Sequence, residues 1–467
     1  MNTPTQSRPE LARDLGLSHA GAVVVGTIIG SGIFLVPTEM MQAVGSARLV
    51  YLAWMVGGLL SFFGALTYAE LGAMKPQAGG EYVYVRDGYG PLAGFLYSWT
   101  TFLISKPASI ATITTGLVRI LGTFSIFSFF SQAFFSHHST HTFTLTYGQL
   151  VAIAATLFIS SLNYIGVRRA GEFQFLFSIL KVAIIVAIAA IGFSYSHGTW
   201  ANFATVFTGA KGGISGFVLA LVAALWAYDG WNDLNMVAGE IRNPQRNIPL
   251  SLIWGVATVG ALYILVNAAV QYVLPAAAIA ASQRPASDAV ALVLGHAGAG
   301  LVSAGIAISM LVTLNGSTMS GARVPFAMAR DGYFFQTIGK VHPRFHTPYT
   351  ALIMQCALAI GLLLLGGNFR QFFSLAIFAE WMFYMIAAST LFVFRFREPN
   401  AHRPYRVWGY PLVPAVFVLA SAFVLYRTFL DNLKSSSIGC LVILAGIPVF
   451  YWFSARRTNL ASRKTAH

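Results

Sequence analysis

Two long apolar segments are each interrupted by glycine and polar residues that a plain membrane anchor would not need. The first interruption is GTIIGSGIF at residues 26–34, and the second is WAYDGWND at residues 226–233. An unwound helix in lipid leaves backbone N–H and C=O groups without partners, which is tolerated where those groups line a cavity or bind a ligand. Glycines that let helices pack closely explain either segment alone equally well. The pair, with Asp229 inside an apolar span, favours a binding site, because a charge within the membrane is costly without a function.

Such breaks suit a zwitterion, which brings both a carboxylate and an ammonium group. A half-helix that begins near Ser31 would present free N–H groups and the positive end of its dipole to a carboxylate, with the Ser31 hydroxyl as an additional donor. The carbonyls around Thr27 and Ile28, and those that end the second half-helix at Trp226 and Ala227, suit an ammonium group. The two breaks therefore predict recognition of the part that all amino acids share.

Three more ionisable residues lie inside apolar segments. Lys181 lies about eleven residues from the start of its segment, too deep to reach the interface easily. We favour a functional role for it, since a lysine near the bilayer centre is costly unless it finds acceptors or loses its proton. Glu380 has no partner that the sequence identifies, and two interpretations stay open: a proton-carrying site, or a protonated carboxyl that bonds silently to a carbonyl. Lys106, before Pro107, is assigned only a structural hydrogen-bonding role.

The composition places these segments in a membrane. Of the 467 residues, 56% are hydrophobic and only 9% are charged, and the mean hydropathy is +0.67, so the chain cannot cover a water-soluble core with polar surface. Apolar runs long enough to cross roughly 30 Å of hydrocarbon recur along the chain. They predict helices at roughly 18–42, 46–74, 88–120, 146–163, 170–196, 213–238, 247–274, 287–330, 348–366, 369–395, 409–431 and 435–455.

The formal net charge of +14 reflects membrane topology rather than nucleic-acid binding. When the spans are numbered from a cytoplasmic N terminus, most of the 29 Lys and Arg residues fall on the cytoplasmic side. This distribution is the positive-inside bias of membrane proteins. We therefore expect a multi-pass protein of the plasma or inner membrane, with both termini cytoplasmic, that contacts lipids and binds no nucleic acid.

The sequence contains no pattern for cofactor, metal or disulfide chemistry. Cys356 and Cys440 both lie in apolar runs, which favours a packing role. His137, His138 and His141 gather in one loop without an acidic or Cys partner, so we expect solvated side chains there and no metal site. Because no nucleophile–base pair and no nucleotide-binding loop occurs, we expect no cofactor and no enzyme activity.

Several motifs together resemble the amino acid–polyamine–organocation superfamily, close to the L-type amino acid transporters, and the resemblance runs almost from end to end. The residues that carry it are GTIIGSGIF at 26–34, YAELG at 68–72, GGEYVY at 79–84, KPAS at 106–109, AYDGWNDLN at 227–235, NPQRNIPL at 243–250, NGS at 315–317, ARDGY at 329–333, and HP with TP at 342–348. GSG alone would be a weak signal, but the set is specific.

The resemblance implies an all-α membrane fold like that of the bacterial leucine transporter. It comprises about 12 transmembrane helices, with an inverted repeat of two five-helix units in which helices 1 and 6 are discontinuous. The expected divisions are a cytoplasmic tail at 1–17, the first repeat at 18–200, the second at 201–395, two additional helices at 396–455 and a cytoplasmic tail at 456–467.

Positions that contact substrate in the family fall on both interruptions. With the backbone argument above, they give an expected binding set of Thr27, Ile28, Gly30, Ser31, Gly32, Trp226, Ala227, Asp229 and Asn232. Trp226 is the expected outer gate over the bound ligand. Asp229 stands where the animal L-type proteins more often have glycine, so its role is not inherited. It could meet the substrate ammonium, carry a coupling proton or point away from the ligand.

The resemblance also bears on coupling and on partners. Sodium-independent members place a lysine at the position of Lys181, where sodium-coupled relatives bind a cation, and we expect its ammonium to tie the fifth helix to the unwound part of the first. The candidates for coupling are Lys181, Asp229 and Glu380. The loop between the third and fourth predicted helices has no cysteine, whereas the animal proteins use one there to link a single-pass glycoprotein. We therefore expect no disulfide-linked heavy chain.

These expectations combine into a sodium-independent secondary transporter of small neutral L-amino acids that works by alternating access, through exchange or through proton-linked or facilitated uptake. A carrier of cationic amino acids or polyamines stays open as an alternative, because Asp229, Asp233 and Glu380 could supply counter-charges. A membrane-embedded enzyme or a substrate sensor is a remote alternative, since no catalytic set and no signalling domain is found.

Overall fold

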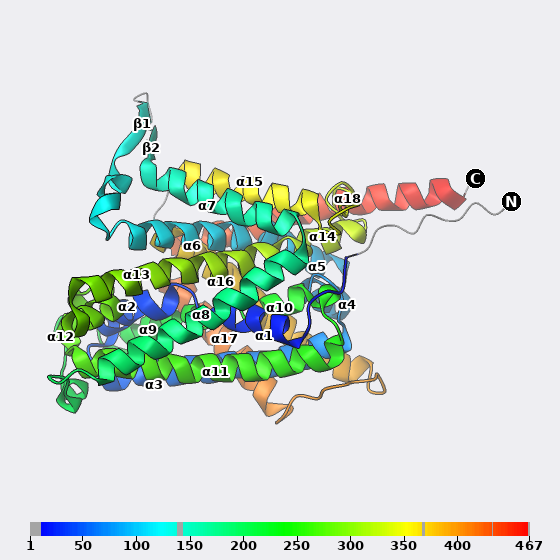
Figure 1. Ribbon diagram of the computed structural model, residues 1–467. Coiled ribbons are helices and arrows are strands. Elements are labelled where there is room, and N and C mark those ends of the chain that lie inside the picture. The colour runs from blue at the N-terminus through cyan, green and yellow to red at the C-terminus, as the bar shows by residue number, and fades with distance from the viewer. Residues whose placement is uncertain (1–10, 138–142, 367–368, 432, 466–467) are drawn as a thin grey trace.

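The computed structural model describes residues 11–137, 143–366, 369–431 and 433–465, and most of them are helical (Figure 1). The helices of the first half are α1 (Leu17–Ile28), α2 (Gly32–Val44), α3 (Ala47–Met74), α4 (Glu81–Tyr89), α5 (Pro91–Thr100), the π-helix η1 (Thr101–Ser105), α6 (Lys106–Leu121), η2 (Ser125–Ser131), α7 (Tyr147–Tyr164), α8 (Val167–Phe193), η3 (Trp200–Ala204) and α9 (Gly213–Ala227). The second half contains α10 (Asp233–Met236), η4 (Ala238–Glu240), α11 (Pro244–Val273), α12 (Ala276–Ala281), α13 (Pro285–Gly321), α14 (Arg323–Arg330), α15 (Tyr349–Leu365), α16 (Phe369–Arg397), α17 (Leu412–Asp431) and α18 (Leu433–Thr465).

Within the described residues, seven stretches are long and apolar enough to cross a membrane: Leu17–Val44, Ala47–Met74, Val167–Phe193, Pro244–Val273, Pro285–Arg330, Leu412–Leu430 and Ser436–Arg457. Two shorter helices, α9 and α15, are also apolar. The chain is therefore a multi-pass membrane protein. The total of about 12 spans, the inverted repeat and its boundaries stay predictions.

Both apolar segments that were predicted to be interrupted are discontinuous. The first breaks between Ile28, which ends α1, and Gly32, which begins α2. The second breaks between Ala227, which ends α9, and Asp233, which begins α10. Within the second break, Gly230 has a φ of 105°, a conformation that side chains with a Cβ rarely adopt.

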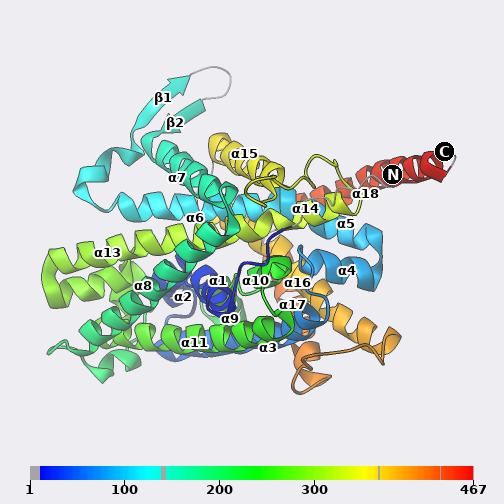
Figure 2. The ribbon, with the colours of Figure 1, turned by 45° about the vertical axis from the view of Figure 1, so that its right-hand side comes forward.

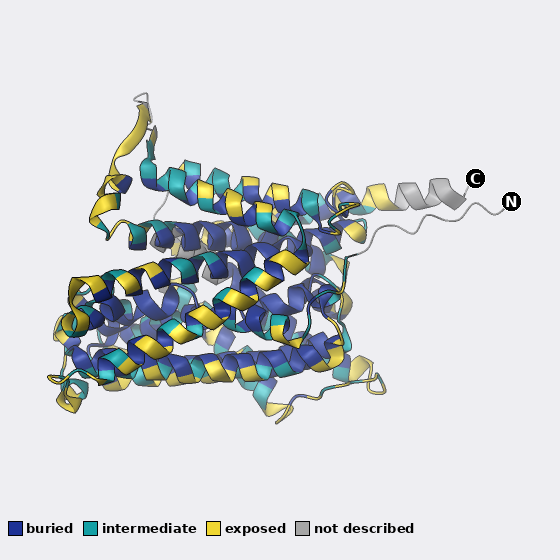
Figure 3. Cartoon of the chain, viewed as in Figure 1, coloured by how far each residue is buried: buried dark blue, intermediate teal, exposed yellow. Residues whose placement is uncertain are grey.

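The interrupted helices lie inside the bundle rather than against lipid. In both views α1 and α2 lie between α13 on one side and α11 with α3 on the other (Figures 1 and 2). α1 packs against α8, α11 and α13, and α2 packs against α9. In the most apolar stretch of α1 and α2, 89% of the residues are buried. The corresponding fraction for α8 is 33%, because the outer face of this helix is exposed (Figure 3). An interior position suits unwound backbone, because protein or a cavity rather than hydrocarbon surrounds it.

Buried ion pairs join the helices at the end of the bundle where α1 begins. Arg323 donates to both carboxylate oxygens of Glu240 at 2.8 and 2.9 Å, and both side chains are fully buried. The Glu70 carboxylate accepts from Arg395 at 2.7 and 3.0 Å, and from the backbone N–H of Val407 at 2.7 Å. Removing one partner of such a pair would leave a buried charge unpaired.

A small hairpin stands away from the helices at the opposite end (Figure 1). Its strands, β1 (Ala133–His137) and β2 (Phe143–Thr146), are antiparallel, with Phe135 opposite Leu145. Of the loop histidines, His138 and His141 lie outside the described residues, so the expectation of a solvated, metal-free loop stays a prediction.

Candidate functional site

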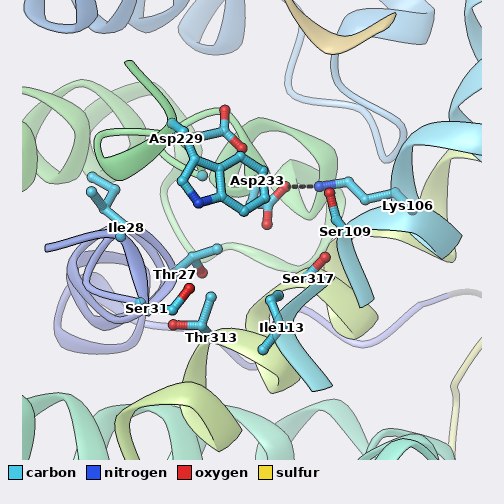
Figure 4. Close-up of a pocket in the computed structure, with 14 residues that line it drawn as sticks. Thr27, Ile28, Ser31, Lys106, Ser109, Ile113, Asp229, Asp233, Thr313 and Ser317 are labelled. Carbon is cyan, nitrogen blue, oxygen red and sulfur yellow. Dashed lines mark hydrogen bonds and ion pairs between the residues drawn. The ribbon is translucent and has the colours of Figure 1, made fainter. Parts of the chain in front are cut away.

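A cavity with about 440 Å³ of empty volume lies where the two breaks meet (Figure 4). Seven residues of the expected binding set line it: Thr27, Ile28, Gly30, Ser31, Gly32, Trp226 and Asp229. The wall is completed by Lys106, Ser109 and Ile113 of α6, Thr313 and Ser317 of α13, and Gly230 and Asp233 of the second break. Four other residues that the sequence predicted for binding or coupling are not among the described residues of this wall: Ala227, Asn232, Lys181 and Glu380.

The two breaks approach each other closely because of two glycines. A Cβ on Gly32 would lie 2.6 Å from the Ala227 Cα, and a Cβ on Gly230 would lie 2.8 Å from the Thr27 Cγ2. Both distances are too short for a real Cβ, so a side chain at either position would push the backbones apart. These glycines therefore set how closely the two unwound segments can approach each other around the cavity.

The first break offers hydrogen-bond donors to an anion. Among the described residues, the backbone N–H groups from Gly30 to Ile33 have no acceptor, and the first bonds of α2 run from Phe34 and Leu35 to the Ser31 carbonyl. Gly30, Ser31 and Gly32 line the cavity. The positive end of the α2 dipole adds to these free donors, so this side of the cavity suits a carboxylate.

Two of the carbonyls that suit an ammonium group are already hydrogen-bonded by a residue that the sequence analysis missed. Tyr263 of α11, which is fully buried, places its hydroxyl 2.9 Å from the Ile28 carbonyl and 2.8 Å from the Ala227 carbonyl. A phenol has one proton to donate, so it cannot satisfy both carbonyls fully at the same time. No pattern in the sequence distinguishes Tyr263 from an ordinary aromatic packing residue.

Lys181 also hydrogen-bonds to the backbone at the first break. Its ammonium donates to the carbonyls of Gly26 and Ile29, both at 2.6 Å, and to Thr313 Oγ1 at 2.9 Å, and the residue is 1% exposed. The lysine thus links α8 to the break between α1 and α2, and it compensates for its burial with three acceptors. Its role in coupling stays a prediction.

The second break carries a network of buried charges. Lys106 pairs with Asp233 at 2.5 Å, a buried partner that the sequence did not identify. The Tyr384 hydroxyl lies 2.8 Å from Asp229 Oδ1 and 3.0 Å from Asn232 Oδ1. The Asn232 amide in turn donates to Glu81 at 2.7 Å. Asn232 is therefore occupied by the protein itself in this conformation.

Glu380 lies beside a second, smaller cavity of about 240 Å³, which shares Lys106 with the first. Its Oε1 accepts a hydrogen bond from Ser109 at 3.0 Å, whereas its Oε2 has no partner among the described residues. The π-helix η1 lines this second cavity through Thr101 and Ser105 and ends directly before Lys106. The sequence placed Glu380 and Lys106 in separate helices and gave no sign that they meet.

The charges around these cavities do not balance. Four carboxyl groups, those of Glu81, Asp229, Asp233 and Glu380, are gathered around Lys106, which pairs with only one of them. Within the described residues, this one ammonium does not balance four carboxylates, and unpaired charges inside a membrane are costly. Within the described residues, no group of His, Cys, Asp and Glu could hold a metal ion.

Comparison with known proteins identifies the family of the chain. The sequence profile of the amino acid permease family matches residues 15–453. The serine/threonine exchanger SteT of Bacillus subtilis (strain 168) is 33% identical over 96% of this chain and 98% of its own length. The b(0,+)-type amino acid transporter 1 of Mus musculus is 31% identical over 97% of this chain and 90% of its own. The Asc-type amino acid transporter 1 of Mus musculus is 30% identical over 95% and 82%.

The matches cover the chain almost completely. The relatives' names describe transporters and exchangers, not enzymes. The chain belongs to the amino acid permease family within the amino acid–polyamine–organocation superfamily, as an amino acid transporter similar to the L-type group.

Proposed function

We propose that the protein is a sodium-independent exchanger of small neutral L-amino acids that works by alternating access around the two broken helices. The observation that carries the proposal is the break between α1 and α2, where the backbone N–H groups of the cavity-lining Gly30, Ser31 and Gly32 have no acceptor among the described residues. They would hold the substrate carboxylate, with the Ser31 hydroxyl beside them. The ammonium would meet the Ile28 carbonyl. The B. subtilis relative, a serine/threonine exchanger by name, supports both exchange and small substrates.

Independence from sodium is supported by the surroundings of Lys181. The carbonyls of Gly26 and Ile29 and the hydroxyl of Thr313 form a set of oxygen ligands of the kind that a small hard cation prefers. The lysine ammonium occupies this set and leaves no room for a metal ion. The cation that would stabilise the first break is therefore part of the chain itself.

A carrier of cationic amino acids is the second candidate, and Asp229 favours it. Its carboxylate adjoins the cavity and accepts from Tyr384, but no basic side chain within the described residues pairs with it. A substrate with a second positive charge would supply that partner. Asp229→Asn should then abolish arginine transport and leave serine transport within about fivefold of wild type, since a hydrogen bond to a neutral group is worth only about 1 kcal/mol. Equal losses for both substrates would contradict this role.

The remaining parts of the proposal concern topology and partners. We propose that both termini are cytoplasmic, that the chain is built from two inverted five-helix repeats with two further helices, and that it works without a disulfide-linked heavy chain. Cys356 lies in α15 and Cys440 in α18, both within apolar helices, which does not suit an external link to another chain.

Uptake into proteoliposomes tests the function. Radiolabelled alanine, serine, leucine, arginine and putrescine would be offered with and without internal amino acid, sodium and an inward proton gradient. We expect uptake of serine and alanine that needs internal amino acid and ignores sodium, and that is lost in Ser31→Trp but kept in the exposed control Ser194→Trp. Uptake that requires sodium would contradict the proposal, as would entry of putrescine alone.

A further inference from the structure

A membrane-facing groove runs between α7 and α15, two helices that contribute no described residue to the substrate cavity. It holds about 940 Å³ of empty volume. On α15 its walls include Ile353, Cys356 and Ala357, residues whose i, i+3, i+4 spacing places them on one face of the helix. Leu157 of α7 and Ile353 of α15 border the groove and are 49% and 54% exposed. Exposed apolar walls of this kind take up acyl chains when the protein lies in a bilayer.

A basic pocket of about 920 Å³ lies near the start of α15, lined among others by Arg330, Lys340 and Tyr349. Arg330 and Lys340 are exposed, and neither forms an ion pair with an acidic residue of the described chain. Arg457 adds a third positive charge, because its side chain lies 3.6 Å from the position of a Cβ on Gly332, which also lines the pocket. The pocket therefore has positive charge and no carboxylate to balance it.

The groove and the basic pocket meet at a cluster of aromatic rings. Tyr349 begins α15 and lines the pocket, and Leu352, one turn further along the same helix, lines the groove. Tyr164, at the end of α7, lines the groove, and its ring lies 6.1 Å from that of Tyr349 and 5.3 Å from that of His342. The two hollows are thus adjacent parts of one surface, with apolar walls at one end and basic side chains at the other.

We propose that this surface binds an anionic phospholipid. The phosphate lies in the basic pocket near Arg330 and Lys340, and an acyl chain lies in the groove between α7 and α15. The charge in the pocket selects a lipid with net negative charge, because a zwitterionic headgroup brings its own ammonium next to the arginine and lysine. An apolar helix of another protein would fill the groove but leave these basic residues without a counter-charge, so charge complementarity favours the lipid.

Native mass spectrometry of the purified full-length protein tests the headgroup half of the site. The protein would be presented with phosphatidylglycerol or phosphatidylethanolamine of identical acyl chains. We expect selective retention of phosphatidylglycerol. In the double variant R330Q/K340Q the affinity for this lipid should fall roughly 30-fold, since each basic residue near an anionic lipid contributes a factor of about five. The matched control is R169Q/R246Q, which removes the same charge from two exposed arginines outside the pocket. Equal weakening in both double variants, or none in R330Q/K340Q, would overturn the proposal.

A second variant tests the acyl-chain half without changing charge. Ala357→Trp fills the groove from an exposed position, and Ala183→Trp on α8 is its exposed control outside the groove. We expect Ala357→Trp to reduce phosphatidylglycerol retention at least tenfold while the control retains it. If the groove instead holds a second copy or another protein, Ala357→Trp will remove a protein mass rather than a lipid mass, and the lipid proposal is then wrong. Because lipid retention is measured without transport, this result is independent of the proposed exchange activity.

Discussion

Tyr263 hydrogen-bonds the backbone at both breaks with a single hydroxyl, and its loss has a measurable consequence. In Tyr263→Phe the carbonyls of Ile28 and Ala227 lose their donor, which should destabilise the empty carrier by about 1–3 kcal/mol. A substrate ammonium can replace that donor, so serine should raise the melting temperature of the variant more than that of wild type. Thermal unfolding in detergent, with and without serine, measures both effects. Tyr89→Phe, which removes an exposed hydroxyl, is the control, and an equal serine-induced shift in all three proteins would contradict the prediction.

The pair of Lys106 and Asp233 gives a second prediction at the scale of single residues. Lys106→Gln leaves the buried Asp233 without its cation and should cost about 3–5 kcal/mol of unfolding free energy. The double variant K106Q/D233N removes both charges and should recover most of that loss. Unfolding curves of the single and double variants in the same detergent measure the difference. If the double variant is no more stable than Lys106→Gln, the ion pair does not account for the loss.

The sequence identified those site residues whose type is unusual for their place in a membrane. Lys181 and Asp229 are charges in apolar segments, and the glycines of both breaks are irregular enough to be noticed. Tyr263 and Tyr384 are ordinary residues of apolar helices, and their importance arises only from hydrogen bonds to segments that are distant in the chain. Such contacts depend on how the helices pack, which periodicity and composition do not specify.

At the scale of helices, the approach of the two breaks depends on Gly32. Gly32→Ala would place a methyl group 2.6 Å from the Ala227 Cα, so α2 and α9 would have to separate. We expect a loss of about 1–3 kcal/mol in stability and serine exchange at least tenfold slower, because the cavity would lose its shape. Gly21→Ala in α1 meets no atom within 4 Å and is the matched control. Wild-type exchange by a stable Gly32→Ala protein would show that the close approach is not required.

Two predicted helices contain local features that the sequence did not predict. Hydropathy located the spans and the glycines located both breaks, but residues 88–120 were expected to form one helix. The structure has α5, the π-helix η1 and α6 there. Residues 287–330 were likewise expected to be continuous, whereas Gly295 has non-helical dihedral angles (φ 71°, ψ −171°) within α13, and Ala322 separates α13 from α14. Hydropathy averages over a window and is insensitive to a local change in helix geometry, so neither feature could be found in this way.

At the scale of the whole molecule, the distribution of positive charge predicts the orientation in the membrane. The start of α1 and the end of α18 lie at the same end of the bundle (Figure 1). The sequence analysis assigns most Lys and Arg residues, Arg169 and Arg330 among them, to the same side of the membrane as the termini. In a background without Cys356 and Cys440, we expect a cysteine at position 194 to react with a membrane-impermeant reagent on intact cells. A cysteine at position 169 should react only after the cells are opened. The reverse pattern would place both termini outside.

The π-helix before Lys106 has a consequence for the rotational phase of the residues that follow it. A π-turn contains one residue more than an α-turn. If the same five residues formed regular α-helix instead, everything after them would turn by about 100° about the axis. Lys106 would then point away from Asp233, and Ser109 away from Glu380. The extra residue that η1 absorbs therefore sets the direction of both side chains, although it hardly changes the hydropathy of the span, so the length of this segment is as important as its composition.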